Sequence, residues 1–116
     1  MSGSSYRVEL GPLAEEDAAR AFRSFLERNP LHAVEWYDGL VDTIESLTRH
    51  PERCARAPED KRLRRGIRQL LYGRGATTFR ILFVVKKEEK LVHVLRIRHG
   101  ARRRLRWKDL FIDQES

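Results

Sequence analysis

Hydrophobic and polar residues follow two different periods along this chain. In the first half, an apolar residue recurs every three or four positions over residues 12–28 and again over 30–50, which predicts two amphipathic helices. Asn29 suits the N-cap of the second helix and Pro30 its first position, whereas Pro51 cannot continue it. The two helices, separated by a short connection, predict a helical hairpin.

After Gly66 the period changes to two, which is typical of β-strands. The predicted strands are a short one at residues 6–10 and three later ones at residues 67–72, 77–85 and 91–98. Residues 51–66 have no sustained period and are predicted to form a long surface connection. The order β-α-α-β-β-β predicts an α+β domain, in which the helical hairpin packs on one face of a small, twisted, mostly antiparallel sheet.

The composition fits one small globular domain of 116 residues, of which 41% are hydrophobic. Residues 1–5 are polar and predicted to be disordered, and the tail 106–116 carries Trp107, Leu110 and Phe111 at the spacing of one amphipathic turn. Because the chain has no long apolar run and no recognisable signal peptide, we expect a cytoplasmic protein without membrane contact. The single cysteine excludes an internal disulfide and a cysteine-rich zinc site.

Positive charge is concentrated in the second half of the chain. The formal net charge is +7, yet residues 61–108 hold 17 of the 24 Lys and Arg residues and only two acids, Glu88 and Glu89. The first 60 residues are acidic on balance. This asymmetry indicates either a polyanionic partner or an acidic protein partner for the second half.

Strand parity predicts where these charges lie, because alternate side chains of a strand point to opposite faces of the sheet. We expect the helices to cover the face that carries Phe79, Ile81, Phe83, Val85, Leu91, Leu95, Ile97, Ile67 and Leu71. The opposite, open face would then carry Arg68, Leu70, Tyr72, Arg80, Val92, Val94, Arg96 and Arg98. A shared platform of guanidinium groups with one aromatic ring suits phosphates and exposed bases.

Three segments give the chain a resemblance to a known family. The strands Arg68–Tyr72 and Phe79–Phe83 and the ending Val94–Arg103, in this order, resemble the RelE/ParE superfamily of type II toxin–antitoxin toxins. The resemblance covers residues 6–105, nearly the whole chain. It implies a sheet with a helical hairpin on one side and a cognate antitoxin protein as partner, through which operator DNA can also be bound.

The superfamily contains two activities. RelE-like members cut mRNA on the ribosome, and the resemblance then implies catalytic roles for Arg80, His99 and Arg102. ParE-like members inhibit DNA gyrase and are not nucleases. The ending His99-Gly-x-Arg102-Arg103 is closer to ParE-like chains, and the Tyr or His-Tyr pair typical of the nucleases is replaced by an Arg-rich stretch with Trp107. We therefore favour gyrase inhibition slightly over RNA cleavage; a third hypothesis is an inactive, nucleic-acid-binding co-repressor.

The candidate site residues each have an alternative structural role. His99 has a side chain suited to general acid–base catalysis, but it could simply end a strand. Arg80 suits a phosphate or a salt bridge to a helix carboxylate, and Tyr72 suits a base or edge packing. The target-binding candidates are Arg68, Tyr72, Arg96, Arg98 and Arg103. We expect no metal, because the histidines are scattered, no cofactor, and an antitoxin segment that is acidic or amphipathic and buries Arg80 or Arg68.

Overall fold

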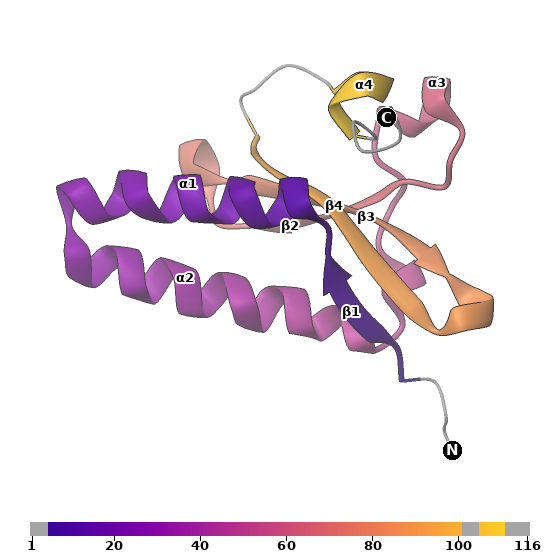
Figure 1. Cartoon of the computed structure of the whole chain (residues 1–116), viewed down its shortest axis with the longest axis horizontal. Helices are drawn as coiled ribbons and strands as arrows, with labels where there is room; N and C mark the ends of the chain where they lie inside the picture. The colour runs from indigo at the N-terminus through magenta and orange to yellow at the C-terminus, as the bar shows by residue number, and fades with distance from the viewer. Residues whose placement is uncertain (1–4, 101–104, 111–116) are drawn as a thin grey trace.

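The computed structural model describes residues 5–100 and 105–110, and the predicted α+β fold is confirmed (Figure 1). In chain order the elements are β1 (Arg7–Leu10), α1 (Pro12–Arg28), α2 (Pro30–Glu45), α3 (Asp60–Leu63), β2 (Arg68–Tyr72), β3 (Phe79–Lys86), β4 (Leu91–His99) and α4 (Trp107–Leu110). The short helix α4 lies where the spacing of apolar residues predicts an amphipathic turn. The predicted disordered start lies outside the described residues, except for Ser5.

The helical hairpin forms as predicted, and local hydrogen bonds explain where α2 begins and ends. The Asn29 side chain accepts a hydrogen bond of 3.2 Å from the backbone N–H of His32 and so caps α2. The helix ends at Glu45, earlier than predicted, and continues as a 3₁₀ turn. At this point the Ser46 hydroxyl donates to the Thr43 carbonyl at 2.6 Å, a local bond that competes with the regular helical pattern.

The sheet has the strand order β1-β4-β3-β2. The strands β4, β3 and β2 are antiparallel to one another, and β1 lies parallel to β4. β1 pairs only with the segment Leu91–Val94. The second half of β4 therefore extends beyond β1 and runs beside α1, which leaves a cleft between helix and strand.

Both faces of the sheet are covered, which corrects the prediction of one open face. On the helix side, the core contains Phe79, Ile81, Phe83 and Ile97 as predicted, together with Val92 and Val94. On the opposite face, a second buried cluster forms between the sheet and the segments 51–66 and 105–110. The members of this far-side cluster are Ala57, Ile67, Leu82, Leu95, Leu105 and Leu110.

A bulge in β4 explains why the predicted parity fails on part of the sheet. Leu82 lies opposite Arg96 while its neighbour Phe83 lies opposite Val94, so Leu95 is an extra residue on β4. One inserted residue exchanges the two faces. Beyond the bulge the predicted parity holds, and before it Val92 and Val94 face the helices, the reverse of the prediction.

The parity predicted for β2 is also wrong. Leu70 and Tyr72 pack against the helix-side core, whereas Leu71 is 55% exposed. Ile67, which precedes the strand, is buried in the far-side cluster. The predicted inward and outward sets of this strand are therefore exchanged.

Gly39 allows the edge strand to approach the hairpin. The Tyr72 hydroxyl donates to the carbonyl of Trp36 at 2.7 Å, and a Cβ atom placed on Gly39 would overlap that hydroxyl oxygen. A glycine inside a helix costs about 1 kcal/mol relative to alanine. A side chain at position 39 would not fit here, because Tyr72 occupies the space beside Gly39.

The connection over residues 51–66 is more ordered than predicted. It contains a 3₁₀ turn at Pro51–Arg53 and the short helix α3. Two carboxylates of this segment, Glu59 and Asp60, are buried, with 4% and 5% of their surface exposed. Buried acids need partners, and these partners define the site.

Candidate functional site

Arg80, the predicted phosphate ligand on the central strand, lies in a buried ion pair. Its guanidinium donates to both carboxylate oxygens of Glu59, at 2.6 to 2.8 Å, and its Nε donates to the Gln69 side chain at 3.2 Å. Only 6% of Arg80 is exposed. This is a bidentate, desolvated pair, so a phosphate could reach Arg80 only by displacing Glu59.

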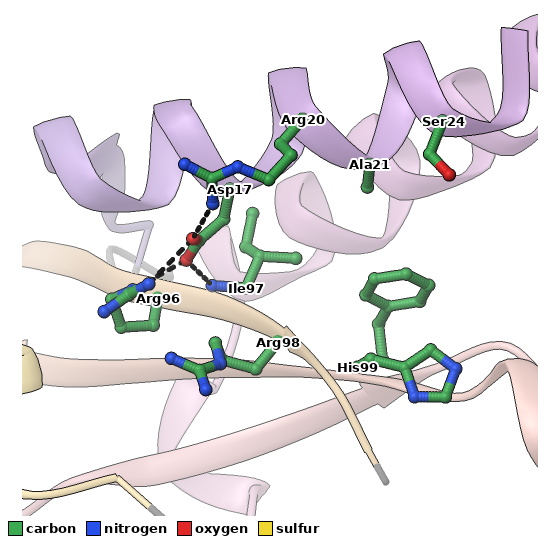
Figure 2. Close-up of a pocket in the computed structure, with 9 residues that line it drawn as sticks. Asp17, Arg20, Ala21, Ser24, Arg96, Ile97, Arg98 and His99 are labelled. Carbon is green, nitrogen blue, oxygen red and sulfur yellow. Dashed lines mark hydrogen bonds and ion pairs between the residues drawn. The ribbon is translucent and has the colours of Figure 1, made fainter. Parts of the chain in front are cut away.

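Arg96 is held in the same way by the first helix. Its Nε and Nη2 donate to the two carboxylate oxygens of Asp17 at 2.7 and 2.8 Å, and the backbone N–H of Ile97 donates to the same carboxylate at 2.9 Å (Figure 2). The hydrogen bond to Asp17 raises the pKa of Arg96 above its ordinary value, against the opposing effect of burial. Arg96 therefore stays charged and paired.

Both ion pairs also hold the C-terminal segment. The backbone N–H of Leu105 donates to Glu59 at 3.0 Å, and Nη1 of Arg96 donates to the carbonyl of Asp109 at 2.6 Å. Leu105 and Leu110 are buried in the far-side cluster between these anchors. The segment 105–110 is therefore fixed to the sheet at two points and covers the face that was predicted to be open.

Two further candidates on the predicted platform have internal partners as well. Nη1 of Arg68 donates to the backbone carbonyls of Cys54 and Glu52 at 2.6 and 3.2 Å. Tyr72 faces α2, and burial, with a smaller effect of the Asp42 carboxylate, raises the pKa of its hydroxyl. The single platform of Arg68, Tyr72, Arg80, Arg96 and Arg98 is therefore not formed.

The structure does bring some candidates together in the cleft between α1 and β4. The cleft has a volume of about 260 Å³ and is lined by Asp17, Arg20, Ala21, Ser24, Phe79, Arg96, Ile97, Arg98 and His99. Figure 2 shows Arg20, Ala21 and Ser24 on the side of α1 that faces the end of β4, where Arg98 and His99 lie. The His99 ring packs edge-on against Phe79, with centroids 5.3 Å apart. Both Arg96 and Arg20 lie near Asp17, so the cleft is cationic on balance.

Sequence reasoning missed the two acids that organise the site. Asp17 lies within the first predicted helix and Glu59 within the predicted surface connection, and neither is among the candidate residues. Neither position carries a local signal of burial, because their partners are distant along the chain. The remaining candidates, Arg102 and Arg103, lie outside the described residues.

No group of three or more His, Cys, Asp or Glu side chains in the described residues could hold a metal ion. Within the same residues, no helix is long and apolar enough to cross a membrane. Cys54 is buried, and burial raises the pKa of its thiol, against the smaller effects of Arg53 and Arg68.

The comparison with known protein families decides the family. A model described as the ParE toxin of the type II toxin–antitoxin system parDE matches residues 8–104. The chain belongs to the ParE toxin family. No curated protein gives a significant match.

Solved structures agree with this family in fold. The ParE-family chain is similar to a chain of the chromosomal ParDE toxin–antitoxin system from P. aeruginosa, with a TM-score of 0.67 and 20% identity over 84% of this chain and 98% of that one. It is also similar to a chain of the RelBE2 toxin–antitoxin complex from Mycobacterium tuberculosis, with a TM-score of 0.55 and 22% identity over 87% and 98% of the two chains. These two likenesses support the fold, while the family match identifies the chain as a type II toxin.

Proposed function

We propose that this toxin stops growth by binding DNA gyrase in the cytoplasm, without cleaving RNA, and that a cognate antitoxin neutralises it. The observation that carries this proposal is the pairing of Arg80 with Glu59. Cleavage of RNA through its own 2′-hydroxyl requires a base, an acid and cations on the phosphate. An arginine that is buried and neutralised by a carboxylate is a poor phosphate ligand, which favours target binding over nuclease chemistry.

The nuclease hypothesis keeps one supporting observation. Arg98 and His99 line the same cleft, beside Ser24 and Arg20. An imidazole can accept or donate a proton, while a guanidinium can neutralise a phosphate. If this toxin cleaves RNA, we expect the cleft between α1 and β4 to be the place of the reaction.

Induction of the toxin without its antitoxin separates the two activities. We expect growth arrest and, in primer-extension maps of abundant mRNAs, no cuts beyond those of uninduced cells. A His99→Gln variant should arrest growth as the wild type does. Codon-dependent cuts that disappear in His99→Gln would reverse the assignment to the nuclease. Normal growth on induction would favour the third hypothesis, an inactive co-repressor.

The antitoxin is proposed to dock on the helical hairpin. Most of the large hydrophobic side chains that stay exposed lie there; they are Leu26, Leu31, Val34, Tyr37 and Val41. Phe22 and Tyr37 meet edge-on, 5.6 Å apart, and with Leu10, Ala18 and Ala19 they line a groove of about 540 Å³. An exposed apolar strip of this kind is typical of an interface.

The charge around this groove indicates what the antitoxin presents. Asp38 and Glu45 each lie four residues after an exposed valine of α2, and Glu15 lines the groove. An amphipathic segment with basic flanks fits an apolar strip with acidic borders. This replaces the expectation of a segment that buries Arg80 or Arg68, because internal partners already hold those two side chains.

A further inference from the structure

We propose that the surface around helix α3 binds the phosphate backbone of nucleic acid. This α3 basic surface consists of Arg56, Lys61, Arg62 and Arg64. All four side chains are exposed, and within the described part of the chain Lys61, Arg62 and Arg64 have no ion-pair partner. The inference concerns residues that have no role in the proposed binding of gyrase or of the antitoxin.

The acids of this segment neutralise Arg56 but not Lys61, Arg62 or Arg64. Glu59 points inward to Arg80, and its side chain is 1% exposed. Asp60 accepts hydrogen bonds from the backbone N–H groups of Arg65 and Ile67, at 2.8 and 2.9 Å. Its other oxygen pairs with Arg56 at 3.0 Å. Both negative charges are thus used to fold the loop, while the cations of α3 remain in solvent.

The pairing of Asp60 is stable near neutral pH. Burial alone would raise the pKa of Asp60, but the hydrogen bonds from Ile67, Arg65 and Arg56 lower it overall. The carboxylate therefore stays ionised and keeps the turn after α3 closed. Arg64 takes the left-handed conformation at the end of α3, with φ of 54°, which Gly66 follows with φ of 77°. This double reversal leads the chain back into β2.

The surface is concave, as a site for a backbone strand requires. A depression of about 770 Å³ lies between the loop before α3 and the turn after it, and its lining includes three cations, Arg56, Lys61 and Arg64, and one acid, Asp60, which Arg56 pairs. Helix α4 lies at the same end of the molecule (Figure 1), and its exposed Lys108 adds positive charge there. Leu63 of α3 packs on the far-side cluster, which also contains Leu110 of α4.

The absence of apolar anchors favours nucleic acid over an acidic protein as the ligand. In the described residues, the exposed large hydrophobic side chains lie on α1, α2 and β2, and none lies between residues 54 and 66. Protein interfaces are organised around an apolar centre, whereas interfaces with DNA are polar and strongly positive. The phosphodiester backbone is therefore the chemistry that this surface fits.

The test measures binding of the purified full chain to a fluorescein-labelled 20-base-pair duplex of arbitrary sequence, by anisotropy at several salt concentrations. The variant Lys61→Gln/Arg62→Gln/Arg64→Gln removes three charges from the surface. The control Arg23→Gln/Arg74→Gln/Lys86→Gln removes three exposed charges elsewhere. Each lost phosphate contact lowers the slope of log Kd against log salt by about 0.9, so we expect the slope to fall by about 2 to 3 in the first variant. The control should change it by less than about 1.

Two results would overturn the proposal. One is an equal loss of slope in both triple variants, which would show that binding depends only on the net charge of the chain and not on the α3 basic surface. The other is displacement of the duplex by poly-L-glutamate at an equal concentration of charges, which would indicate an acidic protein partner. The binding assay measures neither gyrase activity nor growth. A negative result in this assay therefore does not contradict the proposed gyrase inhibition, and a negative result with gyrase does not contradict nucleic-acid binding by the α3 basic surface.

Discussion

Arg80 and Glu59 form a bidentate ion pair in the interior, with 7% and 1% of their side chains exposed, although 21 positions separate them in the chain. The pair joins the central strand to the segment before α3. Because Leu105 also donates to Glu59, the same carboxylate fixes the C-terminal segment over the far face of the sheet. The strand that was predicted to present a cation to solvent instead uses that cation to close the fold.

Glu59→Gln should destabilise the chain strongly, because it leaves the Arg80 charge buried without a counter-charge. Breaking one partner of a buried pair typically costs about 3–5 kcal/mol, which urea unfolding followed by circular dichroism would measure. Trypsin should also cut sooner after Arg106 and Lys108. Glu52→Gln is the matched control, since Glu52 forms an exposed pair with Lys87 at 3.4 Å and its loss should cost less than about 1 kcal/mol. Equal stability of the two variants would refute the anchoring role of Glu59.

Gly39→Ala should destabilise the protein, although alanine normally stabilises a helix by about 1 kcal/mol relative to glycine. The new methyl group would overlap the Tyr72 hydroxyl, and overpacking of this kind costs about 1–3 kcal/mol. Thermal unfolding of Gly39→Ala in the wild-type and in a Tyr72→Phe background separates the two effects. We expect the substitution to cost less when the hydroxyl is gone; an unchanged cost would show that Tyr72 is not the obstacle.

The sequence predicted the elements of the fold but not which face of the sheet each strand residue occupies. The periods of apolar residues predicted the hairpin, the strands and their order, because helices and strands bury one side over many residues. The facing of the first part of β4 was not predictable, because one extra residue at Leu95 exchanges the faces without changing the local pattern. In β2 the adjacent leucines Leu70 and Leu71 point to opposite faces, so the apolar pattern alone did not show which face meets the helices.

The candidate site was predicted only in part for a related reason. The sequence suggested that His99 could end the last strand, and β4 does end at His99. The sequence could not show that Arg96 meets Asp17, 79 positions away, or that Arg80 meets Glu59. Charge counts predict that cations are present, but the fold decides which of them are neutralised inside.

Stability should fall as the pH drops below about 6.5, the ordinary pKa of histidine, because of His93. Burial and the Lys86 charge lower the pKa of His93 in the folded chain, and Glu9 opposes them only partly. Below pH 6.5 the unfolded chain then binds the proton first, so the free energy of unfolding decreases with acidification. Urea unfolding at several pH values should show a shallower decline for His93→Gln between pH 5 and 7 (about the range in which histidine titrates). A decline equal to the wild type would exclude His93 as its source.

Val34→Asp and Val41→Asp should each weaken binding of the cognate antitoxin, because a carboxylate on the apolar strip of the hairpin would be buried without a partner. Isothermal titration of the purified toxin with its antitoxin measures this, and we expect at least a tenfold loss of affinity (about 1.4 kcal/mol) for each variant. Leu71→Asp is the control, since Leu71 is an exposed apolar residue on β2. Weaker binding in Leu71→Asp alone would place the antitoxin on the sheet edge.

Supercoiling of relaxed plasmid by purified gyrase, with the toxin added in increasing amounts, tests the central claim most directly. We predict that the toxin inhibits supercoiling, that Glu59→Gln inhibits less at the same concentration, and that adding antitoxin restores the reaction. Full supercoiling at every toxin concentration, for a toxin whose expression still arrests growth, would contradict the assignment to gyrase.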